Sequence, residues 1–245
     1  MTLFVIAKTI AYSLRDRPSE PHFRFISGLD EWIPIITFNW DVLIESAVLR
    51  RERRVSYAIP RAPDWDPTGK GLRSQKILKL HGSLNWAYCH RCDSVTFLTE
   101  KERVADFLLT NHGVVCKTCE SSDNLHIVIV PPVLAKLDEG DPVMRAVWRD
   151  AYHELRQAER VYIIGYSFPP SDVQTRLFLC KALREAPGLQ EICVVSRPKF
   201  GTDRAQFEDR YTQALSGSQQ EDNIRFYYQR FSRLDLGRLR SGPFA

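Results

Sequence analysis

The second half of the chain alternates between helical and extended patterns of apolar residues. Apolar positions at helical spacing predict helices over residues 142–158, 171–185 and 203–214. Short runs dominated by β-branched residues predict the strands Val161–Gly165, Glu191–Val195 and Ile224–Tyr228. Alternation of helices with buried strands is typical of a parallel, doubly wound sheet, so we expect an α/β fold.

The first half follows the same pattern less regularly. Its apolar positions predict a helix over residues 2–15, a strand Ile33–Phe38 and a helix Asp41–Arg54. A loop rich in Pro, Gly and Asp follows over residues 60–71, and an apolar run Ile77–Leu80 then stops at His81. His126–Val130 returns to a strand pattern that Pro131 ends.

Two Cys-x-x-Cys pairs lie in a stretch with weak helix and strand signals, residues 84–125. We therefore expect one domain formed by residues 1–83 and 126–245, with a metal module inserted at 84–125. Two thiolates separated by two residues can coordinate one ion from a tight turn, and two such turns complete a tetrahedral zinc shell. His90, His112 and His126 are alternative ligands, but four cysteines already fill the shell and leave no position for a reactive water. The predicted structural zinc ligands are Cys89, Cys92, Cys116 and Cys119.

Charge and composition exclude several classes of protein. The chain has 245 residues and a net charge of +4, which is too small to argue for nucleic-acid binding. Its two arginine clusters, at residues 50–54 and in the last 21 residues, are typical of solvated helix faces and termini. No apolar stretch approaches the length of a membrane span, and paired cysteines suit a reducing compartment. These features predict a cytoplasmic protein that binds no membrane.

Polar residues recur where the predicted strands stop. In a doubly wound sheet, ligands bind outside the carboxyl ends of the strands. The residues at those ends are Thr37, Asn39 and Asp41 after one strand, His81 and Ser83 after the next, Gly165, Tyr166 and Ser167 after a third, and Ser196 and Arg197 after a fourth. We expect them to line a binding crevice.

Each of these residues also has a purely structural interpretation. His81 can be a histidine satisfied by hydrogen bonds, or a general base, since imidazole takes up protons near neutral pH. Asn39 and Asp41 can cap the following helix. Gly165 can serve only as a strand-to-loop turn, or it can let backbone approach a phosphate or ribose. Asp172 is best explained as the cap of the next helix.

Taken in order, six segments of the chain resemble the sirtuin family, and most closely its bacterial sirtuin-like branch. They are TFNWD (37–41), KLHGS (79–83), the two cysteine pairs, VPP (130–132), GYSFPPSD (165–172) and VVSRP (194–198). The resemblance covers roughly residues 1 to 230. It implies a Rossmann-like domain with a small zinc module, which binds and consumes NAD, and a role in bacterial defence.

The resemblance also implies roles for individual residues. Asn39 would position the nicotinamide ribose or an attacking water, and Asp41 would hold the nicotinamide carboxamide. His81 would accept a proton from a ribose hydroxyl. The other residues at the dinucleotide would be Thr37, Gly165, Ser167 and Ser196. Apart from the resemblance, the Arg-rich tail and the expected exposed sheet edges predict a partner beyond NAD, either a second copy of the chain or an accessory protein.

The sequence departs from the family pattern in three places. No Gly-rich phosphate loop and first strand precede Thr37, so we expect an incomplete version of a longer protein that alone binds NAD weakly or not at all. Val130 and two prolines stand where deacylating sirtuins pair with a peptide, and prolines remove amide donors. Ser196 stands where the family commonly has an asparagine, which affects contacts with the adenosine ribose. We therefore expect NAD hydrolysis, with NAD-dependent deacylation and a non-catalytic nucleotide-sensing or partner-binding module as alternatives.

Overall fold

The computed structural model describes residues 19–99, 114–122, 125–130, 142–169, 172–198, 203–216 and 223–234. It divides into two compact units. One is formed by residues 1–131 and 137–148, and the other by 132–136 and 149–245. The helix expected over residues 2–15, the prolines after Val130 and the start of the helix expected at Ser171 lie outside the described residues.

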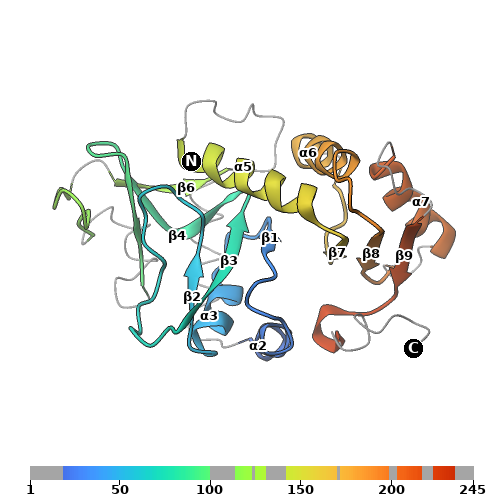
Figure 1. Ribbon diagram of the computed structural model, residues 1–245, viewed down its shortest axis with the longest axis horizontal. Helices are drawn as coiled ribbons and strands as arrows, with labels where there is room; N and C mark the ends of the chain where they lie inside the picture. The colour runs from blue at the N-terminus through green and yellow to red at the C-terminus, as the bar shows by residue number, and fades with distance from the viewer. Residues whose placement is uncertain are drawn as a thin grey trace. The chain divides into compact units, whose positions relative to one another are not determined.

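The first unit contains a parallel three-stranded sheet, shown in blue to cyan in Figure 1. Its strands are β1 (Ile35–Thr37), β2 (Arg53–Ser56) and β3 (Arg73–Lys79), in the order β1–β3–β2. Thr37 pairs with Lys79, so β1 and β3 end side by side. Helices α2 (Glu20–Ser27) and α3 (Leu43–Leu49) contact each other beside this sheet (Figure 1).

An antiparallel sheet follows in the same unit. Strand β4 (Gly82–Cys89) pairs with β5 (Ser94–Phe97) on one side and with β6 (Leu125–Ile129) on the other. Every residue of β4 is buried. The pattern at His126–Val130 correctly predicted β6, whereas β4 and β5 were not predicted.

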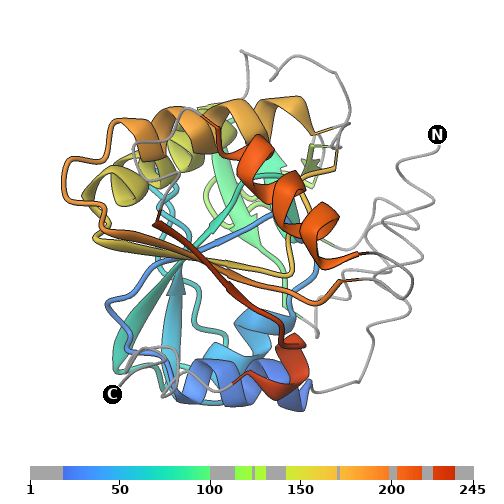
Figure 2. The same cartoon turned by 90° about the vertical axis from the view of Figure 1, so that its right-hand side faces the viewer.

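The second unit contains another parallel sheet, in the order β7 (Arg160–Ile164), β8 (Glu191–Val195) and β9 (Ile224–Tyr227). Two helices, α6 (Val173–Arg184) and α7 (Arg204–Ala214), connect these strands, as Figure 2 shows. The Cys180 thiol of α6 donates to the carbonyl of Ala214 at the end of α7 over 2.9 Å. Contact between the two crossover helices fits two right-handed connections that run in the same direction along the sheet.

Helix α5 (Pro142–Gln157) begins in the first unit and continues into the second, and a short 3₁₀ turn (Phe231–Arg233) follows β9. The mixed α/β class with parallel sheets is confirmed. The described strands form three sheets of three, two parallel and one antiparallel, and in the parallel sheets β1 pairs only with β3 and β7 only with β8 among the described strands.

One helix in the first half was predicted too long. The sequence predicts a helix over Asp41–Arg54, but α3 ends at Leu49 and β2 begins at Arg53. Glu52 has a φ of +53°, a left-handed conformation that cannot continue an α-helix. Arg53 is held instead by hydrogen bonds from its guanidinium to the carbonyl of Leu29, at 3.0 Å, and to the Gln75 side chain, at 3.2 Å.

Candidate functional site

His81 lies in the tight turn between β3 and β4, and its backbone is fixed on both sides. The amide of Leu80 donates to the carbonyl of Thr37 over 3.0 Å, and the amide of Val130 donates to the carbonyl of His81 over 2.9 Å. The buried indole of Trp148 donates to the carbonyl of Leu80 over 2.9 Å. His81 is buried, with 6% of its surface exposed, and its ring lies 5.4 Å from that of Phe38.

The loop after β1 carries the other predicted site residues of this unit. The amide of Asn39 donates to the hydroxyl of Thr37 over 3.2 Å, and the amide of Leu84 donates to the carbonyl of Trp40 over 3.0 Å. Asp41 accepts from the amide of Leu43 at the start of α3, at 3.1 Å, as in an Asx turn; the N-cap position of α3 is Val42, whose side chain makes no capping bond, so Asp41 does not cap the helix. Because β1 and β3 end side by side, Thr37, Asn39, Asp41 and His81 belong to neighbouring strand ends of one sheet.

A buried polar network contacts this loop and is not predicted from the sequence. The Lys79 ammonium and the Glu45 carboxylate are each 1% exposed and lie 2.7 Å apart. The Lys79 ammonium also donates to the carbonyl of Asp41. The available signal was a lysine inside the apolar run of β3, since buried charges are rare unless they are paired.

The network continues from Glu45 to β4. The Tyr57 hydroxyl lies 3.4 Å from the Glu45 carboxylate, and the Asn85 amide donates to that hydroxyl over 3.0 Å. The Ser83 hydroxyl donates to the Asn85 side-chain oxygen over 2.7 Å. The sequence predicts Ser83 at the binding crevice, but the Ser83 side chain is fully buried in this network.

In the second unit, the predicted site residues lie at the ends of β7 and β8. Gly165 has a φ of +68° and donates to the carbonyl of Val195 over 2.9 Å, which places it next to Ser196. The amide of Ser196 donates to the carbonyl of Tyr227 over 3.1 Å. Gly165 and Ser167 are both exposed, so their backbone and hydroxyl are accessible to a ligand of this unit.

The turn after Gly165 is held in place by buried aromatic residues. Phe168 is 4% exposed and has a φ of +49°, a strained conformation for a phenylalanine. The Tyr211 hydroxyl donates to the carbonyl of Tyr166 over 2.9 Å. The Tyr166 hydroxyl donates to Asp172 over 2.6 Å, and burial, with the charge of Asp172, raises the pKa of this phenol. Asp172 also caps α6 by accepting from the amide of Thr175, as the sequence predicts.

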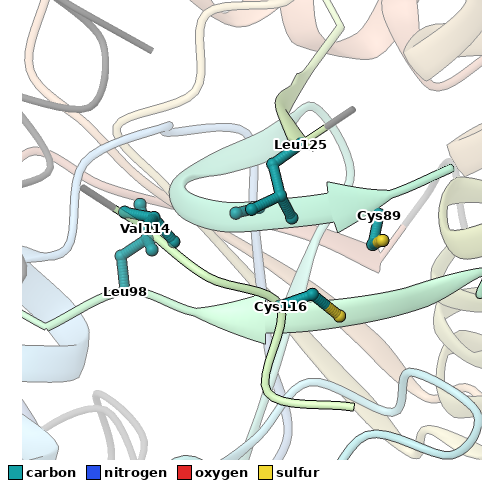
Figure 3. Packing of buried hydrophobic residues seen from close by; sticks show 6 residues of the cluster. Cys89, Leu98, Val114, Cys116 and Leu125 are labelled. Atoms are coloured by element: carbon teal, nitrogen blue, oxygen red, sulfur yellow. The ribbon is translucent and has the colours of Figure 1, made fainter. Parts of the chain in front are cut away.

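The four paired cysteines lie together at the end of the β4–β6 sheet. Their sulfur atoms all lie within 4.8 Å of one another, with 3.7 Å between Cys89 and Cys119 and 3.5 Å between Cys92 and Cys116. A disulfide needs about 2.05 Å, whereas thiolates at about 2.3 Å from a tetrahedral zinc lie roughly 3.8 Å apart. Figure 3 shows Cys89 and Cys116 beside the apolar residues Leu98, Val114 and Leu125.

Neighbouring groups shift the pKa values of two of these thiols in opposite directions. Burial opposes ionisation of Cys116, but hydrogen bonds from the Ser94 hydroxyl and from the amides of Cys119 and Thr118 lower the pKa of its thiol to about 6. A hydrogen bond from the amide of Ser121 lowers the pKa of Cys119, but burial and the three neighbouring sulfurs outweigh it and raise that pKa to about 12. Repulsion between crowded thiolates is relieved by a bound divalent cation, so this donor set fits a closed zinc site.

Comparison with known proteins identifies the family. A family model described as a SIR2-like domain matches residues 34–225, which include all six segments named above. No curated protein matches the chain significantly. None of the described helices has the length and apolar character to cross a bilayer.

Solved structures of Sir2 proteins are similar at a lower level. A Sir2 enzyme shares 14% identity over 92% of this chain and 69% of its own, with a TM-score of 0.43. A Sir2 homologue solved with NAD shares 15% identity over 88% of this chain and 61% of its own, with a TM-score of 0.44. The family assignment therefore rests on the domain match.

Proposed function

We propose that this chain, which belongs to the SIR2-like family, binds NAD and hydrolyses the bond between nicotinamide and its ribose. The observation that carries the proposal is the fixed backbone of His81. Hydrogen bonds to the backbone groups of Leu80 and His81 hold the His81 main chain at a strand end that adjoins the loop with the exposed Asn39. The imidazole of His81, the amide of Asn39 and the carboxylate of Asp41 belong to adjoining strand ends. Together they are suited to orient a ribose and to accept a proton from it.

The proposed reaction breaks the bond between the nicotinamide nitrogen and the first carbon of the ribose. Nicotinamide leaves with the bonding electron pair, and positive charge develops on the ribose ring. Asn39 orients the ribose or the incoming water, and Asp41 holds the carboxamide of the leaving group. His81 accepts a proton from a ribose hydroxyl. Water then adds to the ribose carbon, one of its protons restores the ribose hydroxyl, and His81 releases the proton it had accepted, which yields ADP-ribose.

The second unit and the cysteines have binding and structural roles in this proposal. Gly165, Ser167 and Ser196 contact the dinucleotide, since an exposed glycine and two serines at strand ends supply amide and hydroxyl donors. The zinc held by Cys89, Cys92, Cys116 and Cys119 is structural, because four thiolates leave no position for water. Residues 84–125 then form the metal module of the domain.

Product analysis tests this proposal directly. The chain, and in parallel the full product of the reading frame that contains it, is incubated with NAD, and the products are separated by liquid chromatography and mass spectrometry. We expect nicotinamide and ADP-ribose in equal amounts, with His81→Ala and Asn39→Ala as inactive controls. If neither protein released nicotinamide, the chain would be a binding module and the proposal would be wrong.

The same experiment distinguishes hydrolysis from deacylation. An acetyl-lysine peptide is added to a second sample with the same NAD concentration. Hydrolysis predicts a nicotinamide rate that the peptide does not change and a peptide mass that stays constant. Loss of the acetyl mass in an NAD-dependent manner would instead assign the chain as a deacylase.

A further inference from the structure

Lys79 occupies an unusual position for a charged residue. It is the last residue of β3, two positions before His81, and its side chain is 1% exposed. Removing an ammonium from water is costly unless the ion is paired and fully hydrogen-bonded. Glu45 of α3, equally buried at 2.7 Å, supplies the opposite charge.

The second partner of Lys79 lies in the proposed site. The ammonium donates to the main-chain carbonyl of Asp41, in the loop that carries Asn39. The neighbouring carbonyl, that of Trp40, accepts from the amide of Leu84 at 3.0 Å. Two consecutive carbonyls of the loop are thus fixed, one by the end of β3 and one by β4.

Glu45 also accepts a hydrogen bond from a neutral donor, the Tyr57 hydroxyl. Burial raises the pKa of Tyr57 well above its usual range, and the negative charge of Glu45 raises it further, so the phenol stays protonated. The Tyr57 hydroxyl can therefore donate to Glu45 at 3.4 Å while it accepts from Asn85 at 3.0 Å. The carboxylate that orients Lys79 is connected in this way to β4, the strand that begins directly after His81.

We infer that Lys79, with Glu45, is a positioning residue that holds the loop Asn39–Asp41 in register with His81. The inference rests on the proposed function for the identity of the site. Lys79 does not touch the reacting atoms, and it acts through the carbonyl of Asp41. A buried ion pair adds little net stability over an apolar pair of the same size, but it fixes one arrangement of the groups it bonds.

Two variants separate the effect of leaving Glu45 as an unpaired buried charge from the effect of losing the bond to Asp41. Lys79→Met leaves Glu45 buried without its partner, so the melting temperature should fall sharply. Lys79→Met combined with Glu45→Gln removes both charges, and most of the lost melting temperature should return. The bond to Asp41 is absent in both variants. Arg73→Met, on the same strand but in an ion pair with Glu31 where the arginine side chain is 72% exposed, is the matched control.

The loop itself is monitored by hydrogen exchange with mass spectrometry. In the double variant we expect amides of residues 38–44 to exchange roughly ten- to a hundredfold faster, since a lost bond to a charged donor changes a local equilibrium by such a factor. Amides of β4 should exchange as in the wild type, and Arg73→Met should change neither. Unchanged exchange in residues 38–44, or an equal rise throughout β4, would overturn the positioning role.

Kinetics then distinguish this inference from the proposed function. If the wild type releases nicotinamide, kcat/KM of the double variant should fall by about the same factor as its loop exchange rises. An active wild type with an unaffected double variant would refute the positioning role and leave NAD hydrolysis standing. An inactive wild type whose loop exchange still depends on Lys79 would refute NAD hydrolysis and leave the role of Lys79 in ordering the loop.

Discussion

A β-carbon at Gly82 would lie 2.1 Å from the carbonyl oxygen of Val128. No side chain fits at that distance, and the φ of +77° at Gly82 is a conformation that favours glycine. The residue after His81 must therefore be glycine for β4 to start against β6. The His-Gly pair of the sequence is a steric requirement for the turn that presents His81.

Gly82→Ala should destabilise the fold by about 2–4 kcal/mol, from backbone strain and from displacement of β6. Urea unfolding followed by circular dichroism measures this change. Gly188→Ala is the control, because an added β-carbon there meets no atom within 4 Å and the φ of Gly188 is not left-handed. Equal unfolding midpoints for the two variants would contradict this account of the turn.

The zinc assignment predicts one metal ion per chain. Elemental analysis of the purified protein should find about one zinc, and Cys116→Ser should lose it, because serine is a poor zinc ligand. Chelation should also release the metal and lower the melting temperature, since metal binding stabilises the folded state. Cys180→Ser is the control, because a serine hydroxyl can still donate to the carbonyl of Ala214. Zinc retained by Cys116→Ser would contradict the assignment.

A buried thiol predicts loss of stability at alkaline pH. Burial, followed by the charge of Glu191, raises the pKa of Cys193 to about 12, and the side chain is 0% exposed. An unfolded thiol titrates near pH 8.5, so the folded state holds the extra proton between about pH 8.5 and 12. The contribution of Cys193 is therefore complete below pH 8.5 and declines as the pH rises through this window.

Comparison with Cys193→Ala isolates this effect. Between pH 7.5 and 10.5 the wild type should lose roughly 2–3 kcal/mol more unfolding free energy than the variant, at about 1.4 kcal/mol for each pH unit above the unfolded pKa of about 8.5. Urea unfolding in the presence of a reductant gives both values. Parallel pH profiles for the two proteins would show that Cys193 ionises freely in the folded state.

Tyr211 should matter for ligand binding as well as for stability. Its hydroxyl bonds to the carbonyl of Tyr166 and so holds the turn between Gly165 and Phe168. Tyr211→Phe should weaken NAD binding about three- to tenfold in calorimetric titrations and cost about 1 kcal/mol of stability. Tyr152→Phe also removes a hydroxyl contact, to Glu185 of the same unit, and serves as the control. Equal NAD affinities for the two variants would argue against a role for this turn.

The second unit was well predicted because its local patterns agree with its burial. Strand β8 is apolar after Glu191 and buried throughout, and α7 buries Phe207, Tyr211 and Ala214 at helical spacing. Each of these elements is decided by its own sequence. The residues at the strand ends could be predicted for the same reason, because the apolar runs of β7 and β8 end directly before Gly165 and Ser196.

The first unit was harder to predict because long-range partners decide its elements. Strand β4 shows no alternation of apolar and polar residues, because both its faces are buried. Its polar residues Ser83 and Asn85 are hydrogen-bonded to each other, and Asn85 also bonds to Tyr57. In the sequence, Arg53 continues the helical pattern of α3. Its place in β2 depends on bonds to Leu29 and Gln75, which are distant in the sequence. Helix α2 begins at a Ser-Glu-Pro sequence. Such a sequence is typical of a segment that interrupts a helix, but proline also suits the first turn of a helix.

The role of His81 as a proton acceptor in the cleavage of NAD is tested most directly by one comparison. Nicotinamide release at saturating NAD is measured for the wild type and for His81→Ala, with NAD affinity determined in parallel. We expect kcat to fall about 10²- to 10⁴-fold, as for loss of a general base, while the Kd of NAD changes by less than about threefold. A kcat within about twofold of the wild type would contradict the account.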